Sequence, residues 1–519
     1  MRATFNRLRA YRPSCRAKQQ WERVVNMHTS VGADSPYTFG QQFIGGSWQP
    51  GSSGSRLTVQ NPWDGSLVAE FVEADMSDVE AIYSSAKSAQ EAWADTIPGE
   101  RAAVFRRAAA VMEARQEEIV NWLVHEAGST IAKAQIEWWA VHNSVLEAAT
   151  LPSRVEGRII YGDYPGKENR IYRRPVGVVA VISPWNWPMH LSMRSIAPAL
   201  ALGNAVVVKP AGETPVTGGM LIAKIFEEAG LPPGVLGVVT GPAGTIGDGF
   251  VQHDAARVVS FTGSTEVGRH IGVGAVTAPM IKKAMLELGG NGPLLVTEDV
   301  DLDYAVHVAT VGKFFHQGQM CIAVNRIIVA DAIHDAFVER FVERVRALKT
   351  IDPTDPATAF GPVISLKQLT RIQAMIAKAN EQGARLLLGG DAEGLHLPAH
   401  VFTDVTPDME IARKEIFGPV APILRARDDA HAIELANDTE FGLTSGVLCR
   451  DEGRALRIAQ RIEAGMTHIN DIPAVDMPQL PFGGEKNSGL GRFGSKGIIE
   501  EFTTEHWISV QAGEARYPF

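Results

Sequence analysis

Cys321 and Glu287 are the residues whose types and spacing best suit chemistry on a carbonyl group. Cys321 ends the stretch Phe-Phe-His-Gln-Gly-Gln-Met-Cys (314–321), and the chain has two other cysteines, Cys15 and Cys449. A thiolate is a strong nucleophile toward a carbonyl carbon, and a carboxylate can then activate water against the resulting thioester. Glu287 opens Glu-Leu-Gly-Gly, 34 residues before Cys321. The alternative is a buried structural thiol, which is our expectation for Cys449.

Asn186 and Lys209 each follow a predicted buried strand. Asn186 lies in Pro-Trp-Asn-Trp-Pro (184–188), where two prolines stiffen the strand exit and hold the amide in one direction. Such an amide can donate to the oxyanion that forms when a thiolate attacks a carbonyl. Lys209 stands at the carboxyl end of the next strand, where open α/β sheets bind ligands. A rigid turn and a solvated lysine are the alternatives.

A glycine turn with Ser264 suits a pyrophosphate. The segment Phe-Thr-Gly-Ser-Thr-Glu-Val-Gly (261–268) predicts a strand, a turn and the start of a helix, with free backbone N–H groups beside the Ser264 hydroxyl. A literal G-x-G-x-x-G occurs at 489–494, but no strand precedes it and no βαβ unit surrounds it. We therefore expect a loop there and not a dinucleotide site.

The elements that must position these residues alternate between strands and helices. Strands are predicted at 176–182, 205–208, 235–239, 258–261, 293–296 and 326–329, and helices at 189–202, 215–229, 301–316 and 331–349. This alternation predicts parallel βαβ units in two α/β domains. Glu287 then lies at the junction between the domains, and Cys321 lies in a loop between a helix and a strand.

Several helix boundaries can be predicted from capping residues. Ser77 followed by Glu80 is typical of a capping box that opens a helix through about Trp93, and a second helix is expected from about 100 to 125. Thr214 and Pro215 predict the cap and first residue of a helix, which a glycine at 230 ends.

The composition is that of a globular protein with two to four domains or subdomains. Hydrophobic residues make up 45% and charged residues 21%, and the net charge of −10 argues against nucleic-acid binding. Three cysteines cannot build a disulfide framework and no Cys/His cluster has zinc spacing, so we expect a cytoplasmic protein without a metal site. No apolar run is long enough to span a membrane.

Residues 1–26 differ from the rest, with seven Lys or Arg residues against one Glu. They lack the apolar core of a secretory signal. We expect a disordered extension or an upstream start, with the natural start at Met27, and an Arg-rich transit peptide is the alternative.

Together these motifs resemble the aldehyde dehydrogenase superfamily, in family order from about residue 40 to the end. The other motifs that carry the resemblance are Lys-Glu-Ile-Phe-Gly-Pro-Val (414–420), Asn-Asp-Thr-Glu-Phe-Gly-Leu (437–443) and Pro-Phe-Gly-Gly (481–484). The resemblance implies an α/β fold with a Rossmann-like cofactor domain, an α/β catalytic domain and a small β extension for oligomerisation. It implies a disordered or mis-started extension over 1–34, an NAD(P)-binding domain over 35–152 and 176–289, a catalytic domain over 290–487, and oligomerisation elements over 153–175 and 488–519.

The resemblance also implies roles. Cys321 would be the nucleophile and Glu287 the general base, with Asn186 and the Cys321 N–H forming the oxyanion hole. Lys209 and Glu415 would hold the cofactor riboses. The complete cofactor set is Ser183, Trp185, Lys209, Gly263, Ser264, Gly268, Glu415 and Phe417. The implied partners are a small-molecule aldehyde and further copies of the chain in a homodimer or homotetramer, with no nucleic acid and no membrane.

One departure from the family pattern bears on the cofactor. Gly212 stands where many NAD-preferring members carry a Glu that binds the adenosine ribose, so NAD is expected and NADP remains open.

Four segments bear on the substrate. The segments at 187–194, 316–321, 491–494 and 501–507 are most similar to vanillin and benzaldehyde dehydrogenases. A pocket around Trp187 would suit a flat aromatic aldehyde, unless this residue serves only in the core. The alternatives are an aliphatic or semialdehyde substrate, a CoA-acylating enzyme, and a non-catalytic oligomeric binding protein.

Overall fold

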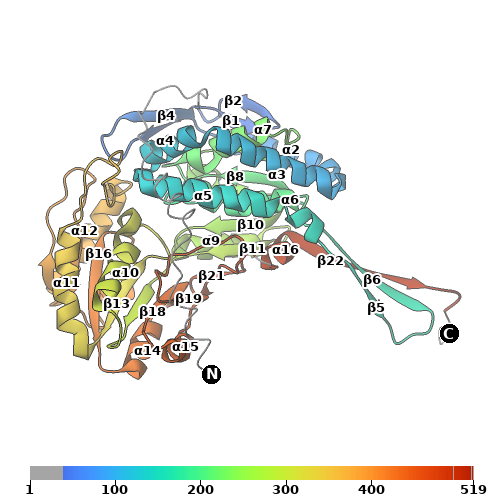
Figure 1. Ribbon diagram of the computed structural model, residues 1–519. Coiled ribbons are helices and arrows are strands. Elements are labelled where there is room, and N and C mark those ends of the chain that lie inside the picture. Colours follow the sequence, from blue (N-terminus) through green and yellow to red (C-terminus); the bar gives the residue numbers. More distant parts are fainter. Residues whose placement is uncertain (1–38, 495, 516, 518–519) are drawn as a thin grey trace.

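The computed structural model describes residues 39–494, 496–515 and 517. The predictions for 1–34 and for a start at Met27 lie outside these residues. The described chain forms two α/β domains side by side, and a narrow three-stranded sheet extends away from the first of them (Figure 1).

The first domain is built on an eight-stranded sheet with the order β2-β1-β9-β8-β7-β10-β11-β21. The strands are β1 (Gln42–Ile44), β2 (Ser47–Gln49), β7 (Val178–Ile182), β8 (Ala205–Lys209), β9 (Leu236–Val238), β10 (Ala256–Thr262), β11 (Lys283–Glu287) and β21 (Gly489–Leu490). The five central strands, from β9 to β11, are parallel, and the outer strands β1, β2 and β21 are antiparallel to their neighbours. The predicted parallel sheet is therefore confirmed.

Helices cover both faces of this sheet. They are α2 (Met76–Asp95), α3 (Pro98–Ala114), α4 (Gln116–Ala127), α5 (Ile131–Ala148), α6 (Pro188–Ala201), α7 (Leu221–Glu228), α8 (Asp248–Gln252) and α9 (Thr265–Thr277). Successive residues of one strand enter different cores: Val179 and Val181 pack with α3 to α7, whereas Val178 and Ala180 pack with α2, α8 and α9. This two-sided burial explains why the strands are continuous apolar runs in the sequence.

The second domain contains a seven-stranded sheet with the order β14-β15-β16-β13-β12-β18-β19, parallel except for β14. Its strands are β12 (Gly292–Val296), β13 (Val324–Ala330), β14 (Arg385–Leu388), β15 (His400–Thr403), β16 (Val420–Ala426), β18 (Thr444–Leu448) and β19 (Met466–Ile469). Its helices are α10 (Leu302–Phe314), α11 (His334–Arg346), α12 (Leu366–Glu381), α13 (Glu410–Arg413), α14 (Asp429–Asn437) and α15 (Glu452–Ala459). Smaller pairs are formed by β3 (Arg56–Gln60) with β4 (Leu67–Val72) and by β17 (Phe441–Gly442) with β20 (Glu485–Lys486).

Arg326 of β13 links several segments of the second domain through hydrogen bonds in its interior. Its guanidinium is fully buried and donates to the backbone carbonyls of Asn291, Leu435 and Ala436 at 2.7–3.2 Å. Burial lowers the pKa of Arg326 to about 10, so the group remains charged at neutral pH. Four hydrogen bonds to carbonyls offset the cost of placing that charge in the core.

Three helix boundaries differ from the prediction. The capping box of α2 uses Asp75 and Asp78, and not Ser77 and Glu80, because Asp75 accepts from the N–H of Ser77 while Asp78 accepts from the N–H of Asp75. The helix expected over 100–125 is two helices, α3 and α4, which meet at Arg115. The first difference arises from local hydrogen bonds that several neighbouring residues could make equally well.

The helix expected from Thr214 instead begins with a π-helical turn, Val216–Met220, before α7. The Thr214 hydroxyl is buried without a partner, so it is not the cap. The carboxylate of Glu126 accepts from the N–H groups of Val216 and Thr217 at 2.8 and 2.7 Å. A side chain about ninety residues away in the chain therefore caps this helix, and no local pattern could predict it.

The segment 489–494 is not a simple loop. Residues Gly489 and Leu490 form β21, which pairs with β11 so that Gly489 lies opposite Glu287. A Cβ atom at Gly489 would lie 2.2 Å from the carbonyl oxygen of Leu286, so only glycine allows this pairing. The expectation of a loop was wrong, whereas the absence of a βαβ unit around this glycine motif is confirmed.

The protruding sheet consists of β5 (Arg158–Tyr161), β6 (Lys167–Pro175) and β22 (Thr503–Gln511), all antiparallel (Figure 1). Within 488–519, only β22 belongs to it, because β21 lies in the first sheet and α16 (Gly497–Phe502) packs into the first domain's core. None of the helices in the described part of the chain is long and apolar enough to cross a membrane.

Candidate active site

The candidate site lies where the carboxyl ends of the parallel strands in the first sheet meet the second domain. Ile182 at the end of β7 pairs with Lys209 at the end of β8, and Thr262 at the end of β10 pairs with Glu287 at the end of β11. Residues that are far apart in the sequence therefore share one edge of the sheet. This is the edge at which open parallel sheets bind ligands.

Glu287 is a carboxyl group held in the interior without a partner. Its side chain is 2% exposed, and neither carboxyl oxygen has a hydrogen bond to any described residue. Burial raises the pKa of Glu287 to about 8, while the charge of Arg194 opposes the rise. A carboxyl group with such a pKa can hold or release a proton near neutral pH, as a general base requires.

Cys321 lies in the loop between α10 and β13, as predicted. The preceding turn contains three consecutive residues with positive φ, His316 (φ 50°), Gln317 (φ 47°) and Gly318 (φ 71°), which reverse the chain direction over a short distance. Burial raises the pKa of Cys321 to about 12, with contributions from the charges of Glu287 and Glu415. The thiol is therefore neutral at pH 7, and its proton must leave when it attacks a carbonyl.

Gly290 brings the Glu287 segment against the Cys321 loop. A Cβ atom at this position would lie 1.9 Å from the Cys321 carbonyl oxygen, so any side chain would push the two segments apart. The glycine that ends Glu-Leu-Gly-Gly is thus needed for contact between the two domains at the site.

The Asn186 side chain reaches the same loop. Its Nδ2 donates to the backbone carbonyl of Gln319 at 2.8 Å, two residues before Cys321. The residue itself is buried, at 4% exposed. The structure therefore brings together Asn186, Glu287 and Cys321, the three residues predicted from the sequence to be catalytic.

Several predicted cofactor residues lie at the strand ends with groups free to bind. Lys209 is 8% exposed, and burial lowers the pKa of its ammonium group while Glu213 and Glu73 oppose this. Ser264 is the exposed N-cap of α9, and its hydroxyl accepts from the N–H of Val267 at 3.5 Å. Such an N-terminus suits a phosphate. Gly263 and Gly268 keep the turn close, since a Cβ at Gly268 would lie 2.2 Å from Leu288.

Glu415, Phe417 and Trp185 form the other side of this region. Glu415 accepts from the Gly290 N–H at 2.8 Å, and burial raises its pKa to about 7. Trp185 and Phe417 contact each other edge to face, with ring centres 5.4 Å apart. The hydroxyl of the remaining member, Ser183, accepts from Ser192 at 2.6 Å. Hydroxyl, ammonium and carboxylate groups beside the exposed N-terminus of α9 fit the riboses and pyrophosphate of a dinucleotide.

The structure adds a buried ion pair that the sequence analysis missed. Lys133 pairs with Glu137 in α5, and both side chains are fully buried. Glu137 also accepts from the N–H groups of Met189 and His190 at 3.0 and 3.1 Å, which holds the first turn of α6 directly after Asn186. The Lys133 ammonium lies 4.7 Å from the centre of the Trp187 ring. Because Lys133 and Glu137 are four residues apart in a helix, the sequence could have indicated their ion pair. It gave no indication of the contacts with α6 and Trp187.

Lys313 is a second residue that the sequence analysis missed. It is fully buried at the end of α10, and its Nζ has no hydrogen bond to any described residue. Burial lowers its pKa to about 7, and the charge of Glu415 opposes this. No sequence signal separated this lysine from a solvated one.

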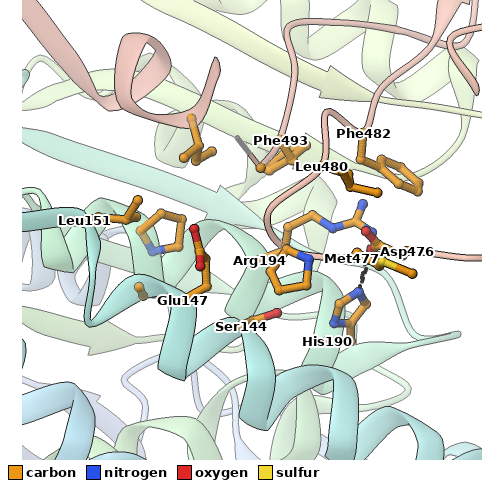
Figure 2. Close-up of a pocket in the computed structure, with 15 residues that line it drawn as sticks. Ser144, Glu147, Leu151, His190, Arg194, Asp476, Met477, Leu480, Phe482 and Phe493 are labelled. Atoms are coloured by element: carbon orange, nitrogen blue, oxygen red, sulfur yellow. Dashed lines mark hydrogen bonds and ion pairs between the residues drawn. The ribbon is translucent and has the colours of Figure 1, made fainter. Parts of the chain in front are cut away.

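A cavity lies between α5 and α6 on one side and residues 476–498 on the other, and His190, which lines it, contacts the ring of Trp187 (Figure 2). Trp187 itself is half-buried and contacts the rings of His190, Phe315 and His316 at centre distances of 6.2–6.3 Å. The apolar walls of the cavity are formed by Leu151, Met477, Leu480, Phe482 and Phe493. The cavity is thus lined largely by apolar side chains, and it adjoins Trp187 through His190.

The sequence model of the aldehyde dehydrogenase family matches residues 48–508. The chain belongs to the aldehyde dehydrogenase family. Over 471 residues it is 51% identical to a vanillin dehydrogenase from Corynebacterium glutamicum, a match that covers 91% of this chain and 97% of that protein. It is 44% identical to a benzaldehyde dehydrogenase from Bacillus subtilis, over 92% of this chain and 98% of the relative.

The fold of this aldehyde dehydrogenase is also that of solved structures. One is an NAD-dependent benzaldehyde dehydrogenase from Corynebacterium glutamicum, with a TM-score of 0.85 and 48% identity, covering 92% of this chain and 98% of that chain. The predicted family and fold class are therefore confirmed.

Proposed function

We propose that this aldehyde dehydrogenase oxidises aromatic aldehydes to carboxylates with NAD. The observation that carries the proposal is the contact between the two domains at Gly290, which sets the Cys321 loop against the buried carboxyl group of Glu287. Among the described residues this carboxyl group has no hydrogen-bond partner. The names of the relatives, which act on vanillin and benzaldehyde, support the aromatic substrate class. Trp187, which contacts the rings of Phe315 and His316, offers such a ring a flat surface to pack on.

In this mechanism Cys321 attacks the aldehyde carbon. Its thiol proton leaves as the C–S bond forms, and Glu287, the carboxyl group whose charge is coupled to the thiol, is placed to accept it. The Asn186 amide, now bonded to the Gln319 carbonyl, donates to the alkoxide oxygen. When bound, NAD would supply the acceptor for the hydride, a proton with two electrons, that leaves the aldehyde carbon. Glu287 releases the thiol proton to solvent and then removes a proton from water, which attacks the thioester. The C–S bond breaks, the carboxylate is released, and the Cys321 sulfur takes back a proton from Glu287.

The dinucleotide would be held by the residues at the strand ends. Lys209 and Glu415 would bond to ribose hydroxyls, and the N-terminus of α9 with Ser264 would face the pyrophosphate. Gly212 leaves open space beside it, because a Cβ at this position would meet only Leu57, at 3.9 Å. That space leaves room for a phosphate on the adenosine ribose, so NADP belongs in the assay beside NAD.

We also propose that the enzyme is a cytoplasmic homodimer or homotetramer that uses the protruding sheet in assembly. Large apolar side chains on this sheet are exposed, among them Ile159, Tyr161, Tyr172 and Trp507. Apolar patches of this kind mark protein interfaces. The free thiols of Cys321 and Cys449 suit a reducing compartment.

Absorbance at 340 nm with NAD or NADP tests the proposal, comparing benzaldehyde and vanillin with hexanal and succinic semialdehyde. Faster oxidation of the two aromatic aldehydes, abolished by Cys321→Ala, is the expected result. Preference for hexanal or the semialdehyde would retain the chemistry and overturn the substrate class. A fully active Cys321→Ala protein would overturn the mechanism. If coenzyme A stimulates turnover, coenzyme A and not water is the acyl acceptor.

A further inference from the structure

The cavity in Figure 2 contains a cluster of charged and polar groups among its apolar walls. His190 and Arg194, one turn apart on α6, meet Asp476 of the C-terminal segment. Their side chains are 9%, 9% and 15% exposed, so all three are largely withdrawn from solvent. The proposed mechanism uses none of them. Burying charged groups costs free energy unless they are paired or bind a ligand.

The hydrogen bonds within this cluster leave one oxygen and several N–H groups free. Asp476 Oδ2 accepts from His190 Nε2 at 2.9 Å and from Arg194 Nη2. No described residue donates to Asp476 Oδ1, and none accepts from Nε or Nη1 of Arg194. The Arg194 guanidinium also lies 3.9 Å from the centre of the Phe482 ring, which fixes its plane. The cluster thus presents an acceptor next to donors, held in place by an aromatic ring.

The cluster is close enough to the reacting residues for its charges to act on them. Against the dominant effect of burial, Arg194 lowers the pKa of Glu287 and of Cys321, and Asp476 raises that of Glu287. His190 also contacts Trp187, which directly follows Asn186. An aldehyde bound at Cys321 whose ring packs against Trp187 would reach this cluster through His190.

We infer that His190, Arg194 and Asp476 recognise a phenolic hydroxyl on the ring of the aldehyde, so that hydroxylated aromatic aldehydes are the preferred substrates. The hydroxyl donates to Asp476 Oδ1 and accepts an N–H of Arg194, while His190 holds the carboxylate in place. A hydroxyl matches this arrangement because it is donor and acceptor at once. A carboxylate would be repelled by Asp476, and a methyl group would leave the free oxygen and N–H groups without partners. This inference rests on the proposed oxidation of aromatic aldehydes and deepens it.

The test compares 4-hydroxybenzaldehyde with 4-methylbenzaldehyde, which has nearly the same size, and repeats the comparison with the 3-substituted pair. For the wild-type enzyme we expect kcat/KM to favour the hydroxyl compound of at least one pair by about tenfold or more, since a site built to bond a hydroxyl rejects an analogue that lacks it. Asp476→Asn and Arg194→Met should reduce that ratio toward one, mainly through KM for the hydroxyl compound. Ser144→Ala is the matched control, because Ser144 lines the same cavity but bonds within its own helix.

A wild-type ratio near one for both pairs would overturn the inference even if neither variant folds. So would an unchanged ratio in Asp476→Asn and Arg194→Met variants that still bind NAD. A lower ratio in Ser144→Ala would also count against it, since that result would reflect the shape of the cavity. Oxidation of neither aromatic aldehyde would refute the proposed function itself, whereas equal oxidation of both would refute only the recognition of the hydroxyl.

Discussion

The buried carboxyl group of Glu287 predicts a pH dependence for hydrolysis of the acyl-enzyme. Burial raises its pKa to about 8, and only the ionised form can take a proton from water. With that pKa about a tenth of the groups are ionised at pH 7 and about nine tenths at pH 9. The rate constant for thioester hydrolysis should therefore rise about tenfold from pH 7 to pH 9, with its midpoint near pH 8.

The assay isolates this step from the rest of the reaction. Cys321 is acylated with 4-nitrophenyl acetate in the absence of cofactor. Excess reagent is removed by rapid desalting, and the loss of the acetyl group is followed by mass spectrometry between pH 6 and pH 10. In Glu287→Gln, which keeps the size of the side chain, hydrolysis should slow by about 10²-fold or more and lose the midpoint near pH 8.

Two results would refute the reasoning. One is a hydrolysis rate that is already constant above about pH 6, because it would mean that Glu287 ionises like an exposed carboxyl group. The other is a Glu287→Gln variant that keeps the wild-type pH profile, because the midpoint would then belong to another group. Lys313 and Glu415, with pKa values of about 7, are the described neighbours to test next.

Three further substitutions have effects that follow from single contacts. Gly290→Ala places a Cβ 1.9 Å from the Cys321 carbonyl oxygen, so the loop must move. The burst of 4-nitrophenolate that is released when 4-nitrophenyl acetate acylates Cys321 should then slow by about 10²-fold. Asn186→Ala removes the amide that would face the alkoxide, and kcat with an aldehyde should fall by about 10²- to 10³-fold with little change in the affinity for NAD. Arg326→Met leaves three buried carbonyls without donors and should lower the free energy of unfolding in urea by ~3 kcal/mol or more.

The substitutions of Gly290 and Arg326 each have a matched control in the chain. Gly99→Ala meets nothing within 4 Å and should leave the burst unchanged. Arg385→Met removes an exposed pair with Asp404 and should cost less than about 1 kcal/mol. A normal burst in Gly290→Ala, an unchanged kcat in Asn186→Ala, or equal losses of stability in the two arginine variants would contradict the corresponding prediction.

Much of the fold could be predicted because its signals are local. The four strands β7, β8, β9 and β10 are short apolar runs buried on both faces, and the positions predicted for them agree with the structure to within three residues. Boundaries that depend on one hydrogen bond were less predictable. Asp75, and not Ser77, caps α2, and Glu126 caps a helix about ninety residues away. Several neighbouring residues could have made the first bond, and the second has no local signature.

The sequence by itself determined the parts that chemistry requires at fixed places along the chain. These are the Cys321 turn, the Glu287 strand end, the rigid exit at Asn186 and the helix start at Ser264. Each combines a reactive side chain with a local conformation, and both properties can be recognised within about eight residues.

Only the tertiary structure decided what surrounds those residues. The pKa of Glu287 depends on its burial and on charges from Arg194 and Asp476, which lie in other parts of the chain. The pairing of Arg194 with Asp476 spans 282 residues and leaves no trace in composition or spacing. Electrostatic energy depends on distance and burial in three dimensions, so protonation and substrate selectivity become visible only when the chain is folded.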